Sequence, residues 1–101
     1  MTKIQVSDRN NDGTITICIR DRFDFSAHKE FRASYRDRPN SSNYVINMQE
    51  VNYIDSSALG MMLLLREYAL ENDGKVSIAN CNPDIRKILT IANFERLFDI
   101  Q

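Results

Sequence analysis

The sequence predicts a single α/β domain, because segments with strand spacing and segments with helix spacing alternate along the chain. The first two segments alternate in polarity around a turn, and each later strand is followed by a helical segment after a short link. The predicted order is β-β-α-β-α-β-α-β, which implies a mixed sheet with helices packed against it, since parallel strands need crossover connections. A chain of 101 residues has room for one such domain, residues 1–101.

The first two strands, residues 3–7 and 14–20, should pair as an antiparallel hairpin. Residues 10–13, with the sequence NNDG, provide a strong turn signal between them. Three isoleucines of the second strand point to one face, which we expect to be the core face: Ile15, Ile17 and Ile19.

The first helix should span residues 26–38, with Ser26 as its N-cap and Pro39 just beyond its end. Residues 44–48, YVINM, form a continuous run of strand formers. Such a run is typical of a central strand that is covered on both faces. Residues 49–54 then lead to the next helix.

The second helix should span residues 56–72, with Gly74 providing its stop. Its buried stripe is predicted to contain Leu59, Met62, Leu63, Arg66, Ala69 and Leu70.

The last third of the chain predicts a strand, a helix and a short strand. Residues 75–79 alternate in polarity, and residues 97–100 form the terminal strand. Between them, the sequence NPD at residues 82–84 is a strong helix start, and Asn93 can take the left-handed conformation that closes a helix. The buried face of this helix should carry Ile85, Ile88, Leu89 and Ala92.

Composition excludes several classes of function. The net charge is −1 with both signs interspersed, so no nucleic-acid-binding surface is predicted. The longest apolar run, residues 58–65, is far shorter than the about 20 residues that cross a membrane, and residues 1–8 lack the apolar core of a signal peptide. We therefore expect a cytoplasmic protein without membrane contact, in which Cys18 and Cys81 are small buried thiols.

No catalytic or cofactor-binding motif is present in the sequence. The single histidine, His28, has no metal-ligand spacing and no triad partner, so a surface position is expected for it. Three glycines in total leave no phosphate-binding loop, and we expect neither a cofactor nor a metal.

The turn at residues 52–60 is the candidate site. Asp55, Ser56 and Ser57 are helix-capping residue types in front of an apolar helix, and an anion there would lie at the positive end of that helix. From spacing alone, helix capping explains these three residues better than a functional role does.

A resemblance extends this interpretation. The sequence DSSALG at residues 55–60, with VNYI before it and MMLL after it, resembles the phosphorylation-site signature of bacterial STAS domains of the anti-sigma-factor antagonist type. Residues 22–24, RFD, and residues 89–94, LTIANF, also look like landmarks of that family. The resemblance implies phosphorylation of Ser56, with Ser57 as the runner-up, and it implies a substrate of a kinase rather than an enzyme.

The family resemblance also implies partners. They are an anti-sigma factor or related regulator with a serine-kinase module, which binds the unphosphorylated protein, and a PP2C-like serine phosphatase, which resets it. Asp24 should lie beside the Ser56 turn, because the carboxyl ends of parallel strands meet at one edge of a sheet. Two roles for it stay open: it positions the serine hydroxyl or contacts the kinase, or it is only a solvated acid of the turn. The expected partner-binding residues are Asp24, Phe25, Ser26, Asp55, Ser56, Ser57, Leu59 and Gly60.

The sequence departs from the family pattern in three places. Asp21 stands where glycine is frequent, Asn47 stands where aspartate is common, and the chain stops at Gln101 where many members carry one more helix. We expect Asn47 to be structural. Two other functions stay open: an adaptor subunit of a lipid-transport ATPase complex or stressosome without a serine switch, and a nucleotide-binding module, against which the missing phosphate loop argues.

Overall fold

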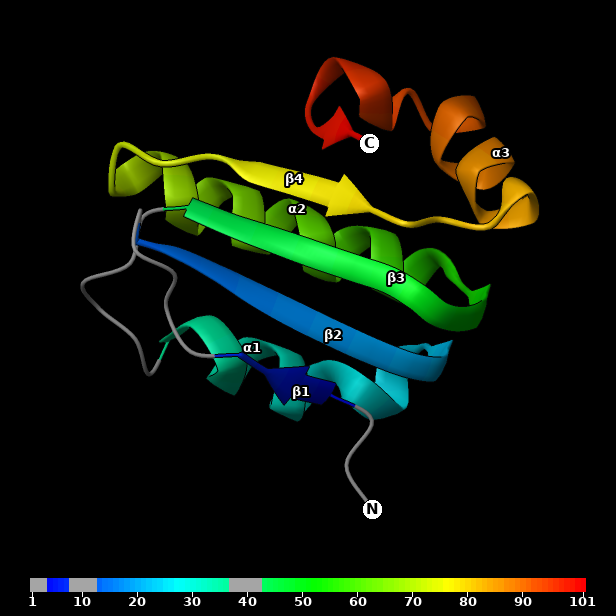
Figure 1. Ribbon diagram of the computed structural model, residues 1–101, viewed down its shortest axis with the longest axis horizontal. Coiled ribbons are helices and arrows are strands. Elements are labelled where there is room, and N and C mark those ends of the chain that lie inside the picture. The colour runs from blue at the N-terminus through cyan, green and yellow to red at the C-terminus, as the bar shows by residue number, and fades with distance from the viewer. Residues whose placement is uncertain (1–3, 8–12, 37–42) are drawn as a thin grey trace.

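The computed structural model describes residues 4–7, 13–36 and 43–101, and the strands in these ranges form one mixed sheet of order β1-β2-β3-β4-β5 (Figure 1). β1 is antiparallel to β2, and the remaining neighbours are parallel. This confirms the predicted element order and the N-terminal pairing, whereas most of the NNDG turn lies outside the described residues. The strands are β1 Ile4–Val6, β2 Thr14–Phe23, β3 Asn43–Ile54, β4 Val76–Ala79 and β5 Asp99–Ile100.

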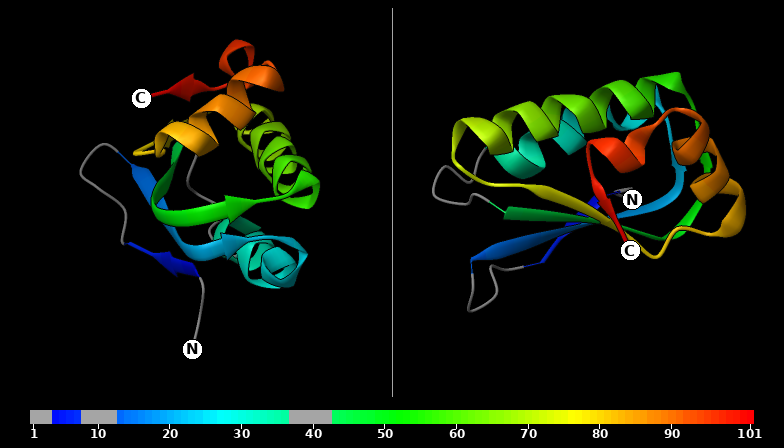
Figure 2. Two further views of the ribbon diagram at one scale, coloured as in Figure 1. Left: turned by 90° about the vertical axis from the view of Figure 1, so that its right-hand side faces the viewer. Right: turned by 90° about the horizontal axis from the view of Figure 1, so that it is seen from above.

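The α-helices are α1 His28–Arg36, α2 Ser56–Glu71 and α3 Pro83–Ile91, and two 3-10 turns accompany them, η1 Phe25–Ala27 and η2 Phe94–Arg96. α1 and α2 lie side by side on one face of the sheet, while α3 and β5 lie at the β4 end (Figure 2). None of the helices in the described part of the chain is both long enough and apolar enough to cross a membrane.

The core lies between the sheet and the helices. The isoleucines at 15, 17 and 19 are buried, as predicted, and they pack in one cluster with Ile46, Met48 and Ile78 of the neighbouring strands. β3 is not covered on both faces, so that prediction was wrong. Val45 and Asn47 point away from the core and stay partly exposed, because α1 and α2 cover the opposite face.

The first helical segment begins earlier than the sequence suggested. Asp24, not Ser26, is the N-cap, since its carboxylate accepts the backbone N–H of Ser26 at 3.0 Å and starts η1. The segment continues directly into α1 and reaches Arg36, and the predicted end at residues 37–38 lies outside the described residues.

Of the predicted buried stripe of α2, only Met62 and Ala69 are buried, and Leu59 is half-buried. Leu63 and Leu70 are exposed and Arg66 is partly exposed. The helix also ends differently: Asp73 takes the left-handed conformation at φ 60°, and the Gly74 N–H then bonds to the Ala69 carbonyl at 2.8 Å. The buried residues are Ala58, Met61, Met62, Leu65 and Ala69.

The start of α3 agrees with the prediction. Asn82 caps it by accepting the Ile85 N–H at 2.9 Å, Pro83 is the first helical residue, and Asn93 is left-handed at φ 61°. Ile88 is exposed rather than buried. The terminal strand is only two residues long, because η2 and its cap take up the chain before Asp99.

Candidate functional site

The candidate site lies at the edge of the sheet where β2 and β3 end together. Phe23, the last residue of β2, is the register partner of Ile54, the last residue of β3 (Figure 1). The next residues are Asp24 and Asp55, and each caps the helical segment that follows it. The structure thus brings the two turns to one edge, as expected for the ends of parallel strands.

Asp55 provides the N-cap of α2. Its Oδ1 atom accepts the backbone N–H of Ala58 at 3.0 Å, from an extended backbone that is typical of this position. This confirms that α2 starts at the predicted turn. It also shows that one aspartate, rather than either serine, satisfies the helix start through its side chain.

The two serines differ in exposure. Ser56 is exposed, whereas Ser57 is half-buried. Within the described residues, neither hydroxyl forms a hydrogen bond. Ser56 therefore presents a hydroxyl to solvent at the positive end of a helix, where the backbone dipoles favour an anion.

Asp24 is held in place by neighbours from its own turn. One carboxylate oxygen accepts the N–H and the hydroxyl of Ser26, and the other accepts Arg22 Nε at 3.2 Å. The Arg22 guanidinium lies 4.0 Å from the centre of the Tyr53 ring on β3, so the pair links the two strand ends. Asp24 is thus a positioned acid at the edge that also carries Ser56.

Apolar side chains are exposed at the same edge. Phe25 is 68% exposed and stacks on the partly exposed His28, with ring centres 5.4 Å apart, and Leu59 is half-buried on α2. Exposed aromatic groups beside a few polar ones are typical of protein–protein contact surfaces. Tyr53 also belongs to this surface, and the sequence did not single it out. It lies opposite Arg22 because of the register between β2 and β3, which the sequence alone does not reveal.

Gly60 lies one helical turn after Ser56, on the same side of α2. It is exposed, and a Cβ atom at this position would meet no other atom within 4 Å. Glycine inside a helix costs stability relative to alanine, so the packing of the domain gives no reason for it. It leaves the helix surface beside Ser56 free of side-chain atoms.

The positions that depart from the family pattern have clear structural roles. Asp21 takes φ 57° at an irregularity of the β2–β3 register, so an aspartate here adopts the backbone conformation that glycine favours. Asn47 Oδ1 accepts the Gln49 N–H at 3.0 Å and Asn80 Nδ2 at 3.1 Å. These bonds connect β3 to the loop after β4, in agreement with a structural role for Asn47.

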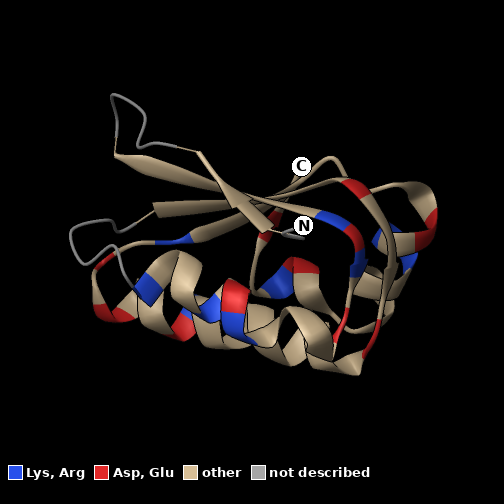
Figure 3. Ribbon diagram, turned by 90° about the horizontal axis from the view of Figure 1, so that it is seen from below, with Lys and Arg blue, Asp and Glu red and all other residues tan. Residues whose placement is uncertain are grey.

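Within the described part of the chain, the thiols and charged groups suggest no second reactive centre. Cys18 and Cys81 are free and only partly buried, so the expectation of full burial was wrong. Burial raises the pKa of the Cys81 thiol, and the nearby Arg86 opposes this shift. Among the residues that the structure describes, no group of three His, Cys, Asp or Glu side chains could hold a metal ion, and acidic and basic residues are interspersed on the surface (Figure 3).

Comparison with known proteins decides the family. The model of the STAS domain family matches residues 5–101. The chain belongs to the STAS domain family. A STAS-domain containing protein of Pseudomonas aeruginosa (strain UCBPP-PA14) is 51% identical over 87 residues, which cover 85% of this chain and 86% of the relative.

Solved structures share the STAS fold at low identity. The Bacillus protein SpoIIAA, an anti-sigma factor antagonist solved in its unphosphorylated form, matches with a TM-score of 0.78 and 19% identity over 97% of this chain and 86% of its own. A sulfate transporter family protein of Wolinella succinogenes matches with a TM-score of 0.76 and 14% identity over 90% of this chain and 75% of its own. At these identities the likeness establishes the fold of this STAS domain.

Proposed function

We propose that this STAS domain is an anti-sigma factor antagonist of the cytoplasm that acts by partner switching at Ser56. The observation that carries the proposal is the exposed Ser56 hydroxyl at the start of α2, which no described residue engages. In its unphosphorylated form the protein binds an anti-sigma factor or a related regulator with a serine-kinase module. Phosphorylation of Ser56 releases it, and a PP2C-like phosphatase resets it, so the protein is a substrate and not an enzyme.

The energetics favour an effect on the interface over an effect on the fold. A phosphate adds about −1.5 to −2 charge and three acceptor oxygens. The helix end favours it by about 0.3 to 1 kcal/mol, and the carboxylate of Asp55 opposes it by a similar amount. These contributions nearly cancel within the domain, whereas like charges or unpaired charges at an interface cost several kcal/mol.

The proposed docking face surrounds Ser56. Phe25 and Leu59 supply apolar contact area, and Gly60 leaves room for a partner's backbone or side chain to approach the helix. Asp24 lies at the same edge with its carboxylate already oriented, which suits a contact to a basic or hydroxyl group of the regulator. Within the expected partner-binding set, the Ser26 hydroxyl bonds to Asp24 and the Asp55 carboxylate caps α2, so these two side chains are already engaged within the domain.

A second candidate function is a STAS adaptor without a serine switch. The similarity in fold to a sulfate transporter family protein supports it, since the same fold occurs there in another setting. In that case the domain would be a subunit of a larger assembly, such as a lipid-transport ATPase complex or a stressosome. Full function of a Ser56→Ala variant and copurification with membrane ATPase subunits would favour the adaptor.

Capture from cell lysate with three variants tests the proposal. Ser56→Ala should retain a regulator with a kinase module, Ser56→Asp should lose it, and Ser57→Ala should behave as the wild type because Ser57 is half-buried. Equal capture by the alanine and aspartate variants of Ser56 would refute the switch.

A further inference from the structure

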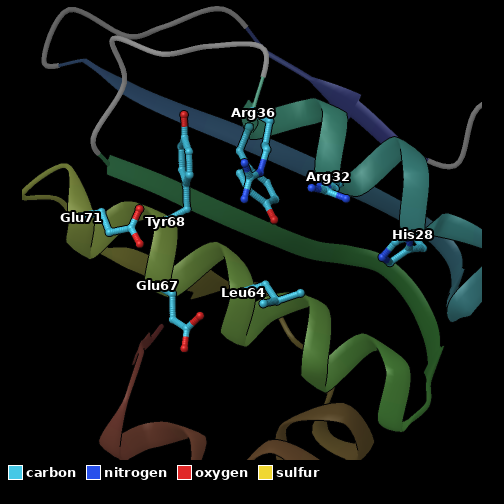
Figure 4. A pocket seen from close by; sticks show the side chains of 8 residues that line it. His28, Arg32, Arg36, Leu64, Glu67, Tyr68 and Glu71 are labelled. Atoms are coloured by element: carbon cyan, nitrogen blue, oxygen red, sulfur yellow. The ribbon is translucent and has the colours of Figure 1, made fainter.

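A cleft of about 240 Å³ lies between α1 and α2, and His28 lines it together with residues of both helices farther along (Figure 4). It is smaller than the about 300 to 1,000 Å³ of pockets that hold drug-sized molecules, so it suits a small metabolite. Leu64 and Tyr68 of α2 contribute its apolar and aromatic surface.

The charged residues that line the cleft are sorted by helix. Arg32 and Arg36 come from successive turns of α1, and Glu67 and Glu71 come from successive turns of α2. Leu64 and Tyr68 lie between the two pairs in Figure 4. Within the described residues, no ion pair joins an arginine of the cleft to one of these glutamates within 4.0 Å.

Other contacts keep the basic side of the cleft in place. The Arg36 guanidinium lies 5.5 Å from the centre of the Tyr68 ring, so it leans over the aromatic surface from the α1 side. Tyr35 is only 3% exposed, and its ring centre lies 5.2 Å from that of Tyr68. Burial raises the pKa of the Tyr35 phenol, and Arg36 opposes that shift. The cleft therefore has a packed aromatic floor with cationic groups on one side and carboxylates on the other.

We propose that this cleft binds a small zwitterionic ligand of the amino acid class with an apolar or aromatic side chain. Its carboxylate would be held by Arg32 and Arg36, because guanidinium groups match carboxylate geometry. Its ammonium group would be held on the α2 side by Glu67 and Glu71, and its apolar part would lie on Leu64 and Tyr68. His28 also lines the cleft and stacks on Phe25 of the Ser56 edge, but none of the residues assigned to the ligand takes part in the proposed serine switch, so the two proposals can be tested separately.

Matched probes test the charge requirement. Phenylalanine carries both charges on an aromatic frame, 3-phenylpropanoate carries the anion alone, and phenethylamine carries the cation alone. Titration of the full chain, followed by calorimetry or by NMR shifts, should give saturable binding of phenylalanine, with each single-charge analogue weaker by about tenfold or more.

Variants test the location. Arg32→Gln and Glu67→Gln should each weaken phenylalanine binding by about tenfold. Lys29→Gln and Glu30→Gln are the matched controls, since both residues are exposed on α1 outside the cleft and their exchange should leave binding unchanged. Thermal unfolding of every variant verifies that the fold is kept.

Three outcomes would overturn the proposal. Equal binding of 3-phenylpropanoate and phenylalanine would indicate a simple anion site. A loss of binding in the controls as large as in the cleft variants would place the ligand elsewhere. No saturable binding of phenylalanine in the millimolar range by the folded wild type would mean that the four charged side chains are only solvated.

Discussion

Replacement of Gly60 by alanine separates what the fold needs from what the proposed interface needs. Gly60 has no positive φ, and its missing Cβ atom would meet nothing within 4 Å. Alanine therefore adds no clash and removes backbone freedom from the unfolded chain. The expected gain in the free energy of unfolding is about 0.5 to 1 kcal/mol.

Urea and thermal unfolding measure this gain. For a domain of this size, about 1 kcal/mol corresponds to a rise in Tm of about 4 to 8 °C. Gly13→Ala is the matched control, because the space around Gly13 is equally empty but its φ is +86°, a conformation that alanine disfavours. In Gly13→Ala, the free energy of unfolding should fall by about 1 kcal/mol.

A Gly60→Gln variant adds the functional side of the same test. Glutamine is a good helix former, so the domain should stay folded while a long side chain projects beside Ser56. Capture of the regulator should fall although stability does not. A loss of stability in Gly60→Ala would refute the structural reasoning, and undiminished capture by Gly60→Gln would refute the docking face.

Two further predictions concern the same turn and the thiols. Asp55→Ala should lower the free energy of unfolding by about 0.5 to 2 kcal/mol through loss of the helix cap, whereas Ser56→Ala should change it by less than about 0.5 kcal/mol; equal losses in urea unfolding would contradict the assignment of the cap. Because burial raises the pKa of Cys81, its thiol should react with a thiolate-specific reagent more slowly in the folded than in the unfolded protein at mildly alkaline pH, as peptide mapping can measure. The folded protein holds the Cys81 thiol proton more tightly than the unfolded chain does. The resulting contribution to the free energy of unfolding is complete at a pH below the thiol pKa of the unfolded chain, and it is lost as the pH rises through the thiol pKa of the folded protein. Equal rates of Cys81 modification in the folded and the unfolded protein would contradict the raised pKa of this thiol.

Short local motifs, such as helix caps and turn residues, correctly predicted where α2 and α3 begin and where α3 ends. The cap at Asn82, the proline after it and the left-handed Asn93 together specify α3 without any tertiary information. The same holds for the start of α2, where Asp55 precedes a long apolar run. Where two capping residues stood close together, as with Asp24 and Ser26, the sequence did not show which carboxylate or hydroxyl would reach the free N–H groups.

Predictions failed where burial depends on the whole fold. α2 is apolar on most of its circumference, so spacing alone did not reveal that Leu63 and Leu70 would face outward. The run around Val45 resembles a strand buried on both sides, yet α1 and α2 share one face of the sheet and leave the other partly open. The α1–α2 cleft was not predictable either, because it exists only where Arg32 and Glu67 are brought together by the packing of the two helices.

The most direct test of the serine switch is the position of the phosphate. The purified domain is incubated with the captured regulator and ATP, and the product is analysed by intact mass and by fragmentation of the peptide that contains residues 55–60. We expect one phosphate on Ser56, which is absent in Ser56→Ala and retained in Ser57→Ala. A phosphate on Ser57, or none on either serine while the regulator still binds, would contradict the account.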